Sequence, residues 1–503
     1  MGYRVLENLH RDCSQYWRGL SLALVVCGPA VAAVIEGVVV EGRLGRPLAR
    51  TQVVLEAAAG AQRTVTDHLG RFTFPDLPAG VYYLSASRPG FATTRLGQRR
   101  WNGPGTPIVL EPDSRFVAEL RLAKLGVISG EVTDENGVGL PDQQVLVYRR
   151  GPPLELVGQG RTDDRGVYRV AGLEPGFYHV RTAPIQLEDG TDLLPTYFPR
   201  TASPEESVAV EVRLDSETSS VNITPLAGKL FRVTGTVGWP GVRSVALYSD
   251  LGRRDAGVDA NGGFVFDQLP PGNYELLAAS AEGGRHLVAY RIFWLSGDIE
   301  GMHLEPAPAP TVSVLCEDRR GRRVDVGQVM LFLRRKQPPS DGGAHRLTCQ
   351  TREALTPGIW ESAVLTPPEQ YVAEMAGERG KLEHGQFPLA AGQSLALRVV
   401  LADTPAALRG TVVSKEGRPV AGATVLLKPL ESDGGWRVRG RNSARTDMEG
   451  NYRLDGLPPG TYQVLASLEY RTPEEADWET LPSQTVTLRE SDRVVLDLKL
   501  SGN

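Results

Sequence analysis

The chain has 503 residues, and its 55 lysines and arginines nearly balance its 60 aspartates and glutamates, which leaves a formal net charge of −5. A charge this small offers no overall field that would attract a polyanion, so we do not expect nucleic acid as a partner. The length is sufficient for several domains of ordinary size.

The N-terminal segment has the layout of a secretory signal. Three arginines precede an apolar run at residues 20–27, and Ala-Val-Ala at residues 30–32 offers a cleavage site between small residues. We therefore expect residues 1–33 to be removed and the mature chain to be exported, as a periplasmic, outer-membrane-associated or secreted protein. A membrane anchor is the alternative, but the run is short for ~30 Å of hydrocarbon. No later apolar stretch approaches ~20 residues, so the mature chain should have no integral membrane span.

Four copies of one pattern follow, and all four keep the same internal spacing. Counted from an aspartate, glycine falls at +3, an aromatic residue at +5, leucine at +10, glycine at +13 and tyrosine at +15. The aspartates and their first glycines are Asp67 and Gly70, Asp163 and Gly166, Asp259 and Gly262, and Asp447 and Gly450. A repeat of this kind predicts an array of related structural units.

The residue types explain what each copy builds. Aspartate accepts hydrogen bonds from the backbone ahead of it and glycine adopts positive φ without steric cost, so Asp-x-x-Gly predicts a tight turn. Alternation such as Phe72-Thr73-Phe74 then indicates a half-buried strand. The proline–glycine stretch ends that strand, because proline has no N–H for a central ladder. A further strand begins at the tyrosine.

Paired strand patterns on both sides of the turn bring each unit to about seven strands, the number expected of a small sandwich. The predicted fold is therefore all-β, a tandem array of about five small antiparallel Ig/transthyretin-like β-sandwiches after the signal segment. The predicted units are residues 34–124, 125–229, 230–309, 310–404 and 405–503.

The fourth unit is a degenerate copy. Gly358-Ile359-Trp360 takes the place of Gly-x-(Phe/Tyr), the Leu-Thr-Pro-Pro sequence at residues 365–368 takes the place of Leu-Pro-Pro, and Tyr371 takes the place of the tyrosine. In this alignment the aspartate is lost and the spacing slips by about one residue. The two cysteines that remain after removal of the signal, Cys316 and Cys349, both lie here. An oxidising compartment favours a disulfide between them, but two buried free thiols fit the sequence equally well.

The combined pattern resembles the carboxypeptidase regulatory-like domain, a transthyretin-like β-sandwich. Its marks are Gly-x-Val, a Gly-x-Pro turn, Thr-Asp-x-x-Gly-x-(Phe/Tyr) and Leu-Pro-Pro-Gly-x-Tyr, and residues 34–124 and 405–503 match them best. The resemblance implies a non-catalytic accessory module of bacterial secreted or envelope proteins. Fold likeness alone does not assign an activity.

No residue pattern for catalysis or metal binding accompanies the repeats. The seven histidines are scattered without the spacing of a zinc peptidase, and neither a Gly-x-Ser-x-Gly elbow nor a phosphate-binding glycine loop is present. One aspartate per turn supplies too few oxygens for calcium, which needs six or more. We therefore expect no catalytic residues, no metal and no cofactor.

Two functions fit such an array. The first is a structural or protein-interaction scaffold at the cell envelope, an extended rod that presents loops and sheet edges to an envelope protein. The second is a carbohydrate-binding array, since these sandwiches resemble starch-binding-like folds, with a polysaccharide held by Trp101, Tyr197 and Trp436. A weaker alternative is an accessory subunit of a separately encoded enzyme.

Overall fold

The computed structural model describes residues 33–501 apart from residues 152–153, 283–284, 325–328, 338–343, 379, 383–384, 431–441 and 471–474. The predicted signal segment lies outside the described residues, except that Ala33 already begins the first strand. Almost all regular structure is β, as the repeat predicted, with one short helix, α1 (Glu475–Thr480).

The first sandwich sets the plan that the others follow. Its first sheet is β4 (Arg71–Leu77), β1 (Ala33–Glu41) and β8 (Arg115–Leu122), and its second is β3 (Gly60–Val65), β2 (Gln52–Ala57), β5 (Gly80–Ser87) and β6 (Thr94–Arg95), with β7 (Ile108–Leu110) also paired to β5. Phe72 and Phe74 point inward from β4, and Tyr82 and Leu84 point inward from β5, into one buried cluster. The period-two alternation predicted from the sequence therefore forms the core.

The second and third sandwiches repeat this plan with different edge strands. The second contains β12 (Val167–Leu173), β9 (Gly126–Glu131) and β17 (Glu217–Thr218), facing β11 (Glu155–Arg161), β10 (Gln144–Arg149), β13 (Gly176–Thr182) and β16 (Val210–Val212), with a small pair β14 (Ile185–Gln186) and β15 (Asp192–Leu193). The third contains β21 (Gly263–Leu269), β18 (Phe231–Val237) and β24 (Ile299–Leu304), facing β20 (Gly252–Gly257), β19 (Ser244–Ser249), β22 (Gly272–Glu282), β23 (Arg285–Leu295) and β25 (Ala307–Pro308).

The fourth and fifth sandwiches add strands to the plan. The fourth contains β29 (Arg352–Ala354), β26 (Thr311–Asp318), β34 (Ser394–Ala402), β31 (Tyr371–Gly377) and β32 (Gly380–Lys381), facing β28 (His345–Thr348), β27 (Met330–Gln337), β30 (Gly358–Leu365) and β33 (Gln386–Leu389). The fifth contains β38 (Asn451–Leu457), β35 (Ala406–Val413), β41 (Arg493–Val495), β42 (Leu498–Ser501), β39 (Gly460–Ser467), β40 (Gln484–Leu488), β36 (Thr424–Pro429) and β37 (Ser443–Arg445).

Every sandwich contains at least one parallel pairing, although the sequence predicted antiparallel sandwiches. The first strand of each unit pairs in parallel with a strand near the end of the same unit, as β1 does with β8. Apart from the parallel pair of β39 and β42 in the fifth sandwich, the remaining strand pairings are antiparallel, as between β1 and β4, where Ile35 lies opposite Phe74. The parallel pair arises because the chain crosses between the two sheets before it returns to its first strand.

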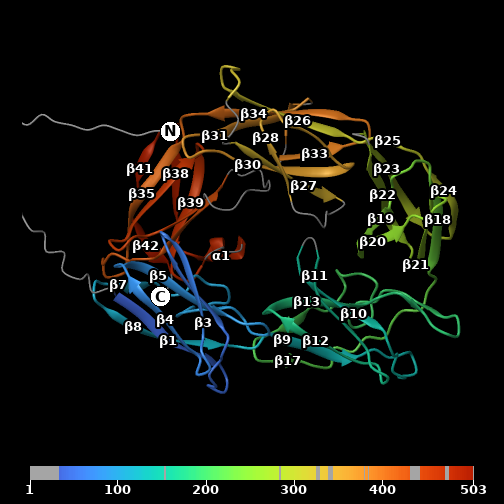
Figure 1. Cartoon of the computed structure of the whole chain (residues 1–503), viewed down its shortest axis with the longest axis horizontal. Helices are drawn as coiled ribbons and strands as arrows, with labels where there is room; N and C mark the ends of the chain where they lie inside the picture. Colours follow the sequence, from blue (N-terminus) through green and yellow to red (C-terminus); the bar gives the residue numbers. More distant parts are fainter. Residues whose placement is uncertain are drawn as a thin grey trace, which may run out of the picture.

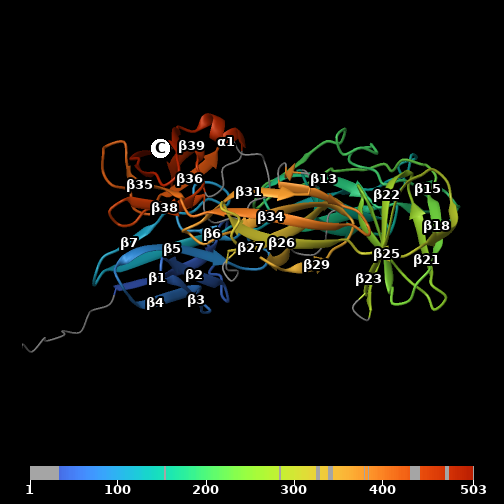
Figure 2. The same ribbon diagram turned by 90° about the horizontal axis from the view of Figure 1, so that it is seen from above.

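The sandwiches form a closed ring, so the prediction of an extended rod is wrong. Figure 1 shows them following one another around the ring, with the first, in blue, next to the last, in red. Figure 2 shows these two sandwiches one above the other at the same end of the molecule. Side-chain contacts join them, including an ion pair between Arg99 and Glu469 at 3.3 Å. Contacts between the first and last sandwiches close the ring. Such contacts join residues far apart in the chain, so local sequence patterns do not predict them.

Candidate interaction surfaces

The repeated aspartates form the turns of the sandwiches. Oδ1 of Asp67 accepts hydrogen bonds from the backbone N–H groups of Leu69 at 2.9 Å and Arg71 at 2.8 Å, and Gly70 has a φ of 72°. The carboxylates of Asp163, Asp259 and Asp447 accept the same pair of bonds, with positive φ at Gly166, Gly262 and Gly450. These carboxylate oxygens therefore accept hydrogen bonds within their own turns.

Backbone hydrogen bonds lower the pKa of two of these carboxylates, Asp67 and Asp163. The bond from the Arg71 N–H is the main cause that holds the pKa of Asp67 below its usual value, and the bond from the Val167 N–H acts likewise on the pKa of Asp163. Hydrogen bonds to the charged form favour ionisation.

Three buried threonines, Thr66, Thr162 and Thr446, tie the same turns to the loop that joins the first two strands of their sandwich. Each threonine hydroxyl donates to one backbone carbonyl and accepts from a backbone N–H nearby. The donated bonds run from Thr66 to Leu48 at 2.6 Å, from Thr162 to Leu140 at 2.6 Å and from Thr446 to Val420 at 2.7 Å. They are the threonines of the Thr-Asp-x-x-Gly motif, and Val258 occupies their place in the third unit.

The repeated tyrosines share one hydrogen bond. Each hydroxyl donates to the backbone carbonyl four residues earlier, from Tyr82 to Pro78, Tyr178 to Glu174, Tyr274 to Pro270 and Tyr462 to Pro458, at 2.6–2.8 Å. Trp360 makes the equivalent bond in the fourth sandwich, from Nε1 to the carbonyl of Thr356 at 2.9 Å.

This bond corrects the alignment of the fourth unit. Trp360 lies on β30 and takes the place of the tyrosine, so the Leu-Thr-Pro-Gly-Ile-Trp sequence at residues 355–360 is its copy of Leu-Pro-Pro-Gly-x-Tyr. The spacing does not slip, because leucine, glycine and aromatic residue keep their intervals. Tyr371 instead lies on β31, which pairs with β34. The prediction was wrong because tryptophan replaces the tyrosine and the aspartate turn has been shortened.

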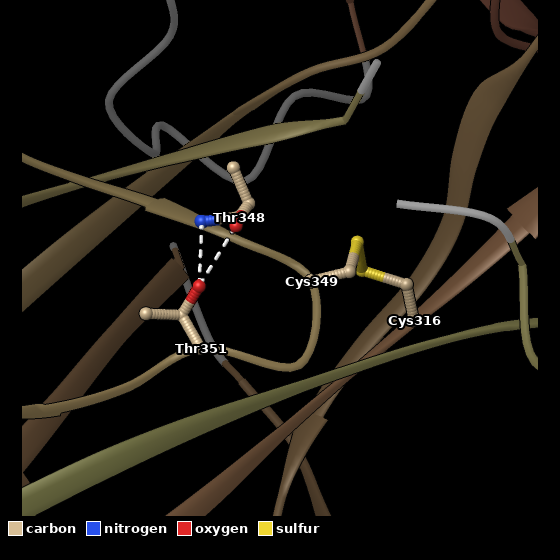
Figure 3. Close-up of a disulfide and its surroundings, with 4 residues drawn as sticks. All are labelled: Cys316, Thr348, Cys349 and Thr351. Carbon is tan, nitrogen blue, oxygen red and sulfur yellow. Dashed lines mark hydrogen bonds between the residues drawn. A yellow bond between two sulfur atoms is a disulfide. The ribbon is translucent and has the colours of Figure 1, made fainter. Parts of the chain in front are cut away.

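A disulfide occupies the place where the fourth unit has lost its aspartate (Figure 3). Cys316 on β26 is bonded to Cys349, with the Cα atoms 5.4 Å apart. Cys349 belongs to the turn between β28 and β29, in which the Thr351 hydroxyl accepts from the Thr348 N–H at 3.2 Å. Both cysteines are buried in the core of this sandwich. The bond therefore ties the turn to the sheet that the aspartate turn approaches in the other units.

The three aromatic residues proposed for sugar contact do not form one surface. Tyr197 is only 2% exposed and packs against the buried Arg181, so the prediction that it contacts a glycan is wrong. The segment that follows β15 carries Tyr197 back along β13, where Tyr197 pairs with Arg181. Trp101 is half-buried in a loop of the first sandwich. Trp436 lies outside the described residues.

The structure instead exposes an aromatic residue that the sequence analysis did not consider. Trp294 on β23 is 62% exposed, and Ile292, two residues earlier on the same face, is 65% exposed. The run Arg-Ile-Phe-Trp-Leu at residues 291–295 leaves a large apolar side chain on each face of the strand. Only one face of the strand can pack against the core, so the large apolar side chains on the other face indicate an exposed apolar surface.

The edge of β23 is open along half of its length. β22 pairs with all eleven residues of β23 on one side, whereas β25 covers only Leu287 and Val288 on the other. Among the residues that the structure describes, no strand pairs with the open side of β23 from Ala289 to Leu295. An uncovered strand edge is a template for pairing with another chain.

Tyrosine–arginine contacts hold the neighbouring sandwiches together. The Arg335 guanidinium of the fourth sandwich donates to the Tyr248 hydroxyl of the third at 2.7 Å, and both side chains are buried. Its carbon also lies 4.9 Å from the centre of the Tyr248 ring. Such contacts combine a charge-assisted hydrogen bond with attraction to the ring face, so they favour one relative placement.

Within the described ranges, no group of three or more histidine, cysteine, aspartate or glutamate residues is arranged to hold a metal ion. The one described helix is too short to cross a membrane, and no membrane-spanning helix occurs in the part of the chain that the structure covers.

Several solved structures align loosely with the chain. The minor pilin of Streptococcus agalactiae is 15% identical and covers 39% of this chain and 97% of its own, with a TM-score of 0.26. A streptococcal ancillary pilin is 11% identical over 54% of this chain and 99% of its own, with a TM-score of 0.20. A putative carbohydrate-binding protein of Bacteroides uniformis is 10% identical over 37% and 99%, with a TM-score of 0.16. Scores this low support no conclusion about function.

No curated protein matches the chain. A family model, the carboxypeptidase regulatory-like domain, matches residues 34–120 and 407–501, which lie in the first and the last sandwich. Each matched segment contains one of the Asp-x-x-Gly turns and one of the tyrosine hydrogen bonds described above, at Asp67 and Tyr82 in the first and at Asp447 and Tyr462 in the last. The chain is therefore a tandem β-sandwich protein that carries carboxypeptidase regulatory-like domains at both ends of its array.

Proposed function

We propose that this protein is a non-catalytic scaffold of the cell envelope, in which a closed ring of five sandwiches holds a binding strand in a fixed position. The observation that carries the proposal is the open half of β23, with Ile292 and Trp294 exposed on an otherwise well-packed sandwich. Large apolar side chains at a strand edge are characteristic of protein contacts, in which main-chain pairing supplies affinity and side chains supply specificity.

The proposal includes export of the mature chain. The N-terminal segment has the sequence of a secretory signal, and the disulfide between Cys316 and Cys349 is of a kind that persists in oxidising compartments. The ring supports the scaffold role, because domains that contact one another on both sides are restricted in their relative motion.

The test is retention of envelope proteins on the purified mature chain. The wild-type protein, Ile292→Lys and Val265→Lys are immobilised separately and exposed to envelope extract. Val265 is the matched control, since it is an apolar residue of the same sandwich with 41% exposure. We expect proteins to be retained by the wild type and by Val265→Lys and lost with Ile292→Lys. Equal retention by all three would show that β23 is not the binding strand.

Carbohydrate binding is the second candidate, and the exposure of Trp294 favours it. Sugars stack on exposed aromatic rings, and Trp294 is the most exposed of the large aromatic side chains in the described residues. A panel of purified polysaccharides distinguishes the two functions. Tight binding of a polysaccharide that is lost on Trp294→Ala or Trp101→Ala, without any retained protein, would replace the scaffold proposal.

A further inference from the structure

The open half of β23 directs its backbone groups away from the sheet. The N–H of Ala309 donates to the carbonyl of His286 at 2.8 Å, so His286 presents its main-chain groups to the side away from β22. Along an antiparallel strand, the main-chain N–H and C=O groups of successive residues point alternately to the two sides. β22 and β23 pair without a register shift, so this alternation continues along β23. Tyr290, Ile292 and Trp294 therefore present N–H and C=O groups on the same open side.

This edge lacks the protection that the corresponding edges have. In the other sandwiches the strands at this position are short, with three residues in β7 and β16, four in β33 and five in β40, and β33 also contains Pro388. β23 has eleven residues and contains neither lysine nor proline. Short strands, charged side chains (lysine above all) and proline are the usual means of preventing edge-to-edge pairing, and the open segment of β23 has only Arg291 among them.

The sequence of the open segment is complementary to itself. When two copies run antiparallel about a twofold axis at Ile292, that residue faces its own copy, Tyr290 faces Trp294 and Arg291 faces Phe293. Ala289 then faces Leu295. Arg291 is the one charged side chain of the segment, so no like charges meet, and its guanidinium meets an aromatic ring instead.

We propose that β23 pairs with β23 of a second copy of this chain, centred on Ile292. This inference rests on the proposed function and names the partner of the same strand. Residues with outward N–H and C=O groups then lie directly opposite one another, as antiparallel hydrogen-bonded pairs require. Tyr290, Ile292 and Trp294 of both copies lie on one face, and the sheets of the two third sandwiches join into one continuous sheet.

A seven-residue strand pair buries less surface than the ~1,600 Å² of a standard interface, so we expect a dimer with a dissociation constant of about 1–100 µM. The exposure of Ile292 and Trp294 shows that this part of β23 is open to solvent. In Figure 2, β23 lies toward the lower side of the ring, beside β25 and away from the contact between the first and last sandwiches.

The test is sedimentation equilibrium of the mature chain over a concentration series. We expect the wild type and the control Val265→Lys to dimerise with the same constant. Ile292→Lys and Ile292→Glu, each alone, should remain monomeric, because the twofold axis places like charges opposite one another. An equimolar mixture of these two variants should form a heterodimer, since Lys and Glu at the axis attract. Unchanged thermal unfolding of each variant shows that it is folded.

Three results would overturn the proposal. They are a wild type that stays monomeric at about 100 µM, a dimer that Ile292→Lys leaves intact, and a mixture of the two charged variants that fails to associate. A monomeric wild type that still loses an envelope protein on Ile292→Lys would refute self-pairing and leave the scaffold function standing. Loss of polysaccharide binding on Trp294→Ala without dimerisation would refute both.

Discussion

Arg445 of the fifth sandwich stacks on Tyr83 of the first, with its guanidinium carbon 3.8 Å from the centre of the ring. The Tyr83 hydroxyl donates to the backbone carbonyl of Gly422, which also belongs to the fifth sandwich. Tyr83 is buried, and this burial raises the pKa of its hydroxyl. One tyrosine thus joins the two ends of the array by a stacked cation and a hydrogen bond.

Tyr83→Ala should open the ring. The substitution removes both contacts and most of the apolar surface that the ring buries at the junction, whereas Tyr83→Phe removes only a hydrogen bond of about 1 kcal/mol. Small-angle X-ray scattering should therefore show a larger maximum dimension for Tyr83→Ala and little change for Tyr83→Phe. Val117→Ala, an exposed position on β8, is the control. An unchanged scattering curve for Tyr83→Ala would show that other contacts close the ring.

Reduction of the disulfide should destabilise the fourth sandwich. Cys316 and Cys349 are 33 residues apart, and a closed loop of that length stabilises the folded state by roughly 3–4 kcal/mol in the chain-entropy model. Scanning calorimetry with and without reductant should show one transition moving to lower temperature. The variant Cys316→Ala/Cys349→Ala should show that lower transition under both conditions. A wild-type transition temperature that does not change with reductant would contradict the prediction.

Substitutions of Trp360 test the corrected alignment of the fourth unit. Trp360→Ala should cost about 3–5 kcal/mol, because it empties a core position. Trp360→Tyr should cost less than Trp360→Phe by about 1 kcal/mol, because tyrosine can donate to the carbonyl four residues earlier and phenylalanine cannot. Denaturant unfolding of the mature chain measures these differences. Equal losses in the tyrosine and phenylalanine variants would count against the hydrogen-bonding role.

Because of the turn aspartates, we expect the folded protein to lose stability in acid. Backbone hydrogen bonds lower the pKa of Asp67 and Asp163 in the folded state. A lowered folded-state pKa contributes stability that is present above the unfolded value, about 3.9, and is lost as the pH falls through the folded value. The unfolding midpoint in urea should therefore decrease below about pH 4.

Asp67→Asn/Asp163→Asn should flatten that decrease, because asparagine keeps an acceptor oxygen but does not titrate. The matched control is Asp164→Asn, an exposed neighbour whose side chain takes no part in the described turn bonds. The prediction is wrong if the double variant and the wild type lose stability in parallel between pH 6 and pH 2.

The sequence was most informative where the interactions are local. The turns at Asp67 and Asp163 depend on hydrogen bonds to backbone groups two and four residues ahead, so the residue types alone predict them. The sequence was least informative where a different residue or bond fulfils the role of a repeated one. Trp360 fulfils the role of a tyrosine, and a disulfide takes the place of an aspartate turn.

By itself the sequence determined the all-β class, the turns and the inward-facing residues of the strands that follow them, because these follow from backbone preferences and from a period of two along the chain. The tertiary structure alone decided that Tyr83 meets Arg445, that Tyr197 is covered, and that Ile292 and Trp294 remain exposed on an open edge. Those outcomes depend on how successive sandwiches are oriented and on which strand another segment covers. Contacts between residues far apart in the chain decide both.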